Sequence, residues 1–228
     1  MFTIVMFTLV GRFALGPNAV RPYVLGMVAQ YIPFMLCAGI VNCMAHERGQ
    51  ATLSLVYASR GNRIVIFFSR QLFHIPNGIV VVVTGLLFSK LLLGLDFNQV
   101  NWGPFITAVA VIIFSSCAAG AFIANFTVMM NDWILLYRLF AGAILVMTGV
   151  IIPITSFPAP ISAFSKILPL THGINAFRQA FDGAGFQETA GSIGAELAVG
   201  VVYMILGIIL YYIVEIIAKR RGIVETTA

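Results

Sequence analysis

Long apolar stretches recur along this chain and alternate with short polar segments. A hydrocarbon core of about 30 Å takes roughly 20 helical residues to cross. Stretches of that length occupy residues 25–45, 75–95, 104–128, 133–154 and 193–218. A shorter stretch at residues 1–15 is apolar apart from Arg12, and we interpret it as the outer part of a first membrane helix. The pattern predicts an all-α polytopic membrane protein with about six transmembrane helices.

Prolines interrupt the run that follows the fifth stretch. Proline removes a backbone donor and clashes with the preceding turn, so it ends or kinks a helix. The interruptions fall at Pro153, Pro158, Pro160 and Pro169. Apolar residues at helical spacing lie between and after them, at Ile161, Phe164, Leu168, Ile174, Phe177 and Phe181. Two short helices are therefore expected over residues 155–182, as a re-entrant hairpin that dips into the outer face without crossing.

The longest polar connection covers residues 46–72 and carries helical signals of its own. Glu47 places negative charge before a short predicted helix at residues 50–58. A second predicted piece, residues 63–72, has its apolar side chains, among them Phe67 and Phe68, facing lipid or protein. Its Arg63 and Arg70 face the headgroups, as in a helix that lies in the membrane interface. A plain basic flank is the alternative reading of the same residues.

Composition supports lipid as the solvent, because 60% of the residues are hydrophobic and only 9% are charged. The net charge of +5 comes from cations scattered over span ends, with no aromatic-lined soluble face, so nucleic-acid binding is not expected. Cations near span ends are retained on the cytoplasmic side. With the N-terminus inside, that side holds Arg48, Arg60, Arg63, Arg70, Lys219, Arg220 and Arg221. Both termini are thus expected to be cytoplasmic in a multi-pass protein of the cell membrane.

The candidate catalytic and metal-binding motifs in this sequence are incomplete. His46 and Glu47 would begin a zinc-protease HExxH motif, but Gln50 stands where the second histidine would be, so no metal site is expected. An intramembrane enzyme would need cooperating polar side chains on facing spans. His74 and His172 are expected at opposite membrane faces, so we expect no catalytic residues.

Ionisable residues within the predicted spans are few. Asp132, Glu196 and Glu215 are placed at span ends, and only Lys90 and Arg138 lie further in. An ion-gradient-driven secondary transporter or channel would need ionisable groups paired at mid-membrane. That class remains the alternative, and the pattern disfavours it.

Two stretches carry a resemblance to the membrane subunit of ABC transporters of the ABC-2 type, a permease family that includes drug, antibiotic and polysaccharide exporters. Glu47-Arg48-Gly49-Gln50 resembles the family motif Glu-Arg-x-x-Gly-Thr, but it is shorter and has Gln50 where the family usually has Thr. The family's Pro-rich hairpin, which ends near PLTHxxxxxR, is similar to FPAPIS followed by Pro169-Leu170-Thr171-His172 and Arg178.

The resemblance implies a single ABC-2 type transmembrane domain over residues 1–228 that moves an amphipathic or lipid-linked substrate out of the cytoplasm. It implies coupling to an ATPase through Glu47, Arg48, Gly49, Arg60 and Arg63. It also implies an outer hairpin that includes Pro153, Pro158, Pro169, His172 and Arg178. No GxxxxGK[ST] phosphate loop is present. A separate cytoplasmic ABC ATPase, in two copies, would therefore bind ATP and Mg, and a second permease copy or homologue would complete a lipid-embedded dimer.

Overall fold

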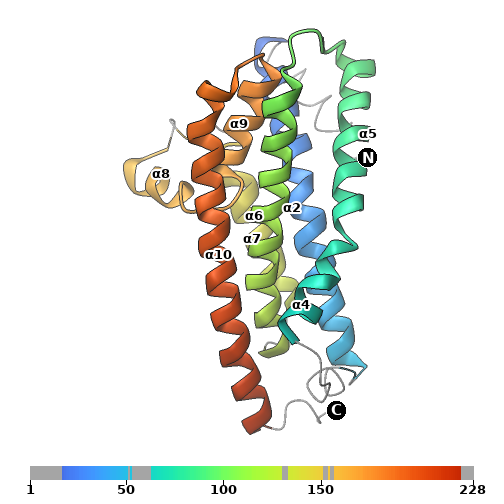
Figure 1. The fold of residues 1–228 in the computed structure, drawn as a ribbon, viewed down its shortest axis with the longest axis vertical. Helices are drawn as coiled ribbons and strands as arrows, with labels where there is room; N and C mark the ends of the chain where they lie inside the picture. The colour runs from blue at the N-terminus through green and yellow to red at the C-terminus, as the bar shows by residue number, and fades with distance from the viewer. Residues whose placement is uncertain are drawn as a thin grey trace.

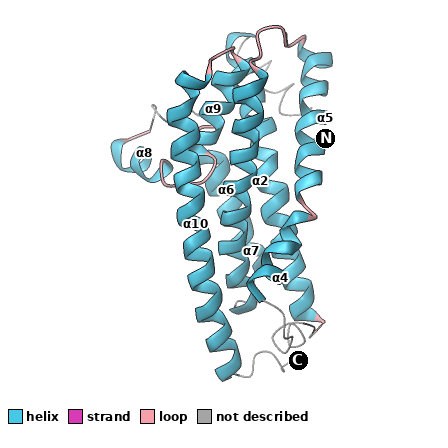
Figure 2. Cartoon of the chain, viewed as in Figure 1, coloured by secondary structure: helices cyan, strands magenta, loops and turns pink. Residues whose placement is uncertain are grey.

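The computed structural model describes residues 17–50, 52, 63–129, 133–150, 154 and 157–221. Within these ranges the chain forms helices joined by turns and contains no strand (Figures 1 and 2). The helices are α2 (Pro17–Gly49), α4 (Arg63–Leu72), α5 (Ile75–Leu93), α6 (Trp102–Met129), α7 (Trp133–Met147), α8 (Ala159–Ser165), α9 (Thr171–Phe181) and α10 (Phe186–Arg221). The predicted all-helical class is confirmed for this part of the chain.

Membrane-spanning length is reached by four helical segments among the described residues. These segments are Arg21–Gly49, Ser69–Leu91, Trp102–Thr127 and Phe186–Ile217. The helix at the predicted fifth span is shorter, with its apolar part at Ile134–Met147. The predicted first span, residues 1–15, lies outside the described residues. The chain is a multi-pass membrane protein by these helices.

In the described part of the chain, two buried apolar clusters form the core: the larger is built mainly by α2, α5, α6 and α9, and the smaller by α2, α6 and α10. Helix α6 packs against both α2 and α10 over most of its length, and α5 packs on α2 (Figure 1). A Cβ at Gly200 in α10 would lie 2.9 Å from the Phe114 ring and 3.1 Å from the Ser115 Cα in α6. The absence of a side chain at Gly200 therefore allows these two helices to approach closely.

Several helix ends differ from the predicted spans, and α2 already begins at Pro17, eight residues before the predicted start at residue 25. Helix α2 continues through Gly49, so residues 46–49 form its last turn rather than the start of a separate connection. Helix α10 begins at Phe186, seven residues before the predicted start, because polar residues in its first turn lower the hydropathy without breaking the helix. Helix α7 ends at Met147, and Gly149 then adopts a φ of 82°.

Two short helices follow that break, as predicted. Helix α8 begins after Pro158, and α9 begins after Leu170, whose φ of 81° lies in the left-handed region. Helix α8 projects sideways from the bundle and α9 lies in the upper part of Figure 1, whereas α4 and the C-terminal ends of α2 and α10 lie in the lower part. The helices of the predicted hairpin and the described part of the predicted coupling region are thus near opposite ends of the bundle.

Candidate functional site

A polar cluster joins α4 to the end of α2. The Glu47 carboxylate pairs with the Arg70 guanidinium, with Oε2 2.8 Å from Nη2. Only 20% and 13% of these side chains are exposed, so water screens this pair less than it screens a surface pair. Arg70 also lies against Met44, with Nη1 3.1 Å from the sulfur. The sequence singled out Glu47 but did not indicate its partner.

The same cluster is tied to α6 by two side-chain hydrogen bonds. Arg48 Nη1 donates to the Thr127 carbonyl at 3.0 Å, and Gln71 Nε2 donates to the Cys117 carbonyl at 2.7 Å. Since Gln71 belongs to α4, this short helix is attached to both α2 and α6. Of the other predicted coupling residues, Gly49 is the last residue of α2, Arg63 is the first of α4, and Arg60 lies outside the described residues.

A second polar cluster surrounds Arg178 of α9. Its Nε donates to the Pro22 carbonyl in α2 at 2.9 Å, and Nη1 and Nη2 donate to the Gly149 and Val150 carbonyls at 3.1 and 3.2 Å. Gly149 and Val150 are buried just past the end of α7, where the helix supplies no further donors. Arg178 therefore satisfies carbonyls that the broken helix leaves free. Burial lowers the pKa of Arg178 to about 10, which still leaves the guanidinium charged at neutral pH.

The neighbours of Arg178 make space for it. A Cβ at Gly26 of α2 would collide with Arg178 Nη2. Nearby, Arg21 forms an ion pair of 2.9 Å with Asp182, but 39% and 60% of these side chains are exposed. An exposed pair of this kind contributes little to stability. Arg178 is thus the cation that holds α9 to α2 and to the end of α7.

A third cluster centres on Glu196 of α10, whose side chain is wholly buried. Its Oε1 accepts hydrogen bonds from the Leu170 N–H at 2.7 Å and from the Ser115 hydroxyl at 2.5 Å. Its Oε2 accepts from the Gly173 N–H at 2.9 Å. Leu170 and Gly173 lie at the N-terminus of α9, where backbone N–H groups lack helical partners. One carboxylate therefore joins α9, α6 and α10.

The predicted placement of Glu196 at a span end was wrong. Because α10 begins at Phe186, Glu196 lies well inside the helix. An acidic residue inside an apolar helix is itself a signal of a specific role. Because the span was predicted to start at residue 193, Glu196 was assigned to a span end and its position inside the helix was missed.

The remaining predicted hairpin residues are distributed around these clusters. Pro158 precedes α8, Pro169 is buried before α9, and Pro153 lies outside the described residues. His172 Nε2 donates to the Lys166 carbonyl at 3.1 Å and so links α9 back to the end of α8. This hydrogen bond of His172 shares no partner residue with the hydrogen bonds of Arg178.

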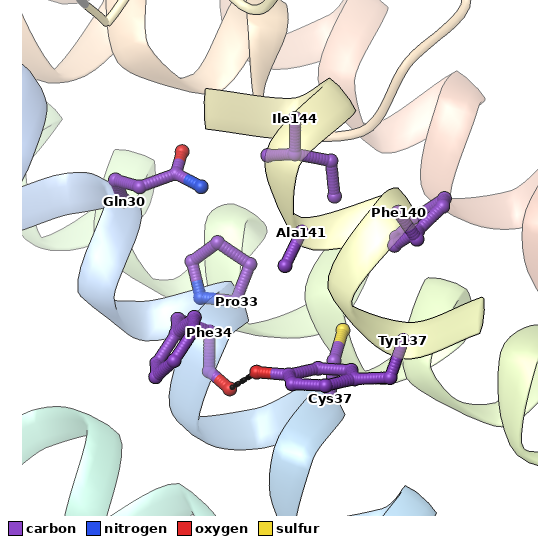
Figure 3. Close-up of a pocket in the computed structure, with 8 residues that line it drawn as sticks. All are labelled: Gln30, Pro33, Phe34, Cys37, Tyr137, Phe140, Ala141 and Ile144. Carbon is purple, nitrogen blue, oxygen red and sulfur yellow. Dashed lines mark hydrogen bonds between the residues drawn. The ribbon is translucent and has the colours of Figure 1, made fainter. Parts of the chain in front are cut away.

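The contact between α2 and α7 leaves almost no internal space. Figure 3 shows side chains of the two helices facing one another, with the Tyr137 hydroxyl donating to the Phe34 carbonyl at 3.1 Å. The cavity between them measures about 10 Å³, which is room for one water at most. A larger open groove of about 510 Å³ lies on the surface between α4, α5, α6 and α10, and its walls are mainly apolar.

Comparison with known proteins identifies the family. The family model described as ABC-2 type transporter matches residues 1–181, which include the Glu47 motif and the whole of α9. Comparison with curated proteins gives no match. The membrane domain of this family is a permease without an ATPase domain, and such permeases generally pair with an ABC ATPase. The chain belongs to the ABC-2 type transporter family, as a membrane permease component.

Proposed function

We propose that this chain is the permease subunit of an ATP-driven exporter that moves an amphipathic or lipid-linked substrate out of the cytoplasm. The observation that carries the proposal is the path of α2. This helix of 33 residues is about 50 Å long. Its last turn is paired with α4 through Glu47, and its first turns are bonded to the hairpin through Arg178. A displacement at one end of α2 therefore reaches the other end.

A rigid-body mechanism follows from these attachments. Two copies of a cytoplasmic ABC ATPase would bind ATP and Mg, and their closure would push on residues 47–63, with Glu47, Arg48, Gly49, Arg60 and Arg63 at the contact. Because α4 is bonded to both α2 and α6, the push would move these helices together. Motion of α2 would then pull on Arg178 and change the position of the hairpin.

The distribution of cations supports a topology with the coupling region inside the cell and the hairpin outside, which the proposed export requires. The cations of α4 and of the end of α10 gather at one end, and the hairpin with Pro158, Pro169, His172 and Arg178 lies toward the other (Figure 1). The positive end is expected to be cytoplasmic, with both termini there. A cysteine introduced at Ala163, which is exposed on α8, should then react with a membrane-impermeant reagent added outside the cell. Labelling from the cytoplasmic side alone would contradict this topology.

The substrate path is expected between two copies of the bundle or between the bundle and a homologue. Within one chain, the space between α2 and α7 admits no substrate. Copurification of the tagged chain should recover two permease chains with two ATPase chains. Uphill transport by the permease in vesicles without any nucleotide-consuming partner would overturn the proposal.

Coupling can be measured by ATP hydrolysis of the copurified complex in liposomes. Glu47→Ala and the charge reversal Arg60→Glu should each reduce substrate-stimulated ATP hydrolysis by the partner ATPase, while the protein still inserts into the membrane. Glu188→Ala is the matched control, because Glu188 is an exposed carboxylate in the first turn of α10, at the other end of the bundle. Wild-type hydrolysis in both coupling variants would count against this role for residues 47–63.

An ion-gradient-driven transporter or channel is the second candidate, and the buried Glu196 is the observation that would favour it. The three hydrogen bonds of its carboxylate come from a hydroxyl and two backbone N–H groups. These neutral donors already hold both oxygens. Glu196 is therefore better suited to fix helices than to bind a transported ion.

A further inference from the structure

We propose that Glu196 is a positioning residue that fixes the hairpin helix α9 to α6 and α10, so that the hairpin reports the movement of α10 during transport. The proposal rests on the proposed function as an ATP-driven permease. Helix α10 extends from Phe186 beside the hairpin to Arg221 at the opposite end of the bundle (Figure 1). Glu196 lies where α10 meets α9.

The chemistry of the contact suits a permanent attachment. A buried carboxylate is costly unless hydrogen bonds replace the lost water. Glu196 receives three such bonds, two of them from N–H groups at the N-terminus of α9. The partial positive charge of that terminus stabilises an anion further. Separation of α9 from α10 would leave Glu196 with Ser115 alone and would remove the carboxylate partner of both N–H groups.

The backbone around the contact admits little adjustment. Leu170 has a positive backbone φ, which residues other than glycine rarely adopt. Its N–H is one of the donors to Glu196. A Cβ at Gly173 would lie 2.6 Å from Ile112 Cγ1 and 3.3 Å from Glu196 Cδ. The start of α9 is therefore seated directly on α6 and α10, and such strain persists only where the surroundings impose it.

The hairpin is thus attached to two parts of the bundle. Glu196 holds the N-terminus of α9 to α6 and α10, and Arg178 holds its C-terminal half to α2 and the end of α7. A displacement of α2 relative to α10 must then rotate or strain α9. Helix α8, which projects from the bundle just before α9, should move with it.

A cysteine at Ala163 of α8 tests this in the full complex with its ATPase. The native Cys37, Cys43 and Cys117 are first replaced by alanine. The rate of modification by a membrane-impermeant maleimide is then compared without nucleotide and with ATP plus vanadate. In the wild-type background the two rates should differ, and Glu196→Gln should abolish the difference. Glu188→Gln, a control in the same helix, should preserve it.

Hydrogen exchange gives a local readout of the attachment. In Glu196→Gln the amide nitrogen replaces one acceptor, so the Leu170 or Gly173 N–H loses its partner. Exchange in residues 170–173 should then accelerate at least about tenfold, the factor that about 1.4 kcal/mol represents. Exchange in α5 should not change. Uniform acceleration over all helices would indicate a general loss of stability and would overturn the positioning role.

A second variant decides the matter if Glu196→Gln fails to insert. Both the Ser115 and the Ser116 hydroxyl lie within hydrogen-bond distance of the Ile112 carbonyl, but only Ser115 also reaches Glu196, to which its proton is donated. Ser115→Ala should accelerate exchange at residues 170–173 and weaken the nucleotide response at Ala163→Cys. Ser116→Ala should leave both as in wild type. Equal effects of the two serine variants would overturn the proposal.

A reporter at the other end separates this proposal from the proposed function. Phe73, between α4 and α5, is 82% exposed, and Phe73→Cys should respond to nucleotide through the coupling region. If Phe73→Cys responds and the Ala163→Cys response survives Glu196→Gln, the role of Glu196 is wrong and the permease function stands. If Phe73→Cys does not respond in the wild-type background, the ATP-driven mechanism itself is wrong.

Discussion

Loss of the Arg178 guanidinium should loosen the hairpin and lower the stability of the whole bundle. Its three hydrogen bonds join α9 to α2 and to the end of α7. Arg178→Ala removes all three. The buried Gly149 and Val150 carbonyls then lose the donors that the described residues give them, because α7 has already ended.

The size of the effect follows from those two carbonyls. A hydrogen bond to a charged group contributes about 1.5–3 kcal/mol, so the two bonds together contribute about 3–6 kcal/mol. Part of this is offset because a partly buried charge is removed as well. We expect a net loss of about 3 kcal/mol. For a chain of this size, that corresponds to a fall in melting temperature of about 6–12 °C.

The assay is thermal unfolding in lipid nanodiscs at one fixed heating rate. Arg178→Lys should recover less than half of the loss, since an ammonium cannot reproduce the planar fork. Arg21→Gln is the matched control: it removes a neighbouring arginine whose ion pair is largely exposed, so the melting temperature should change by no more than about 4 °C.

Gly26 allows a sharper test. In the wild-type background, Gly26→Ala should destabilise the protein, because its Cβ would displace the guanidinium. In the Arg178→Ala background two of the three nearest atoms are gone and the Val150 carbonyl at 3.2 Å remains, so the same change should cost less. Gly142→Ala, whose Cβ meets nothing within 4 Å, should act equally in both backgrounds. Additive effects of Gly26→Ala and Arg178→Ala would refute the inferred contact.

Three further predictions concern other contacts. Gly200→Ala should lower the melting temperature, because its Cβ would press on α6 and overpacking costs about 1–3 kcal/mol; Gly194→Ala, which meets nothing within 4 Å, should raise it slightly, and equal effects would contradict the close approach of α6 and α10. Glu47→Arg and Arg70→Glu should each reduce thermal stability and ATPase coupling, and the paired reversal should recover part of both; no recovery would argue against a direct pair. Tyr137→Phe should cost no more than about 1.5 kcal/mol in the same unfolding assay, since it removes one hydrogen bond to α2, and a larger loss would mean that the hydroxyl has a further role.

Much of the architecture was predictable because a membrane restricts the choices. Backbone groups cannot stay unpaired in hydrocarbon, so long apolar stretches form helices. The amphipathic residues 63–72 indicated α4 with its observed bounds, and the prolines indicated that the chain breaks before α8 and α9. The four long spans followed from hydropathy, whereas α7 proved shorter than its apolar stretch because the chain turns at Gly149.

The sequence by itself determined the helical membrane class, the family resemblance and the two stretches that carry the proposed function. Only the tertiary structure decided the partners of the polar side chains, such as Glu196 with Ser115, which lie 81 residues apart in sequence. These partners depend on the rotation of each helix about its axis and on close approaches at Gly26 and Gly173. Periodicity does not reveal that rotation here, because the surfaces facing lipid and the surfaces facing other helices are equally apolar.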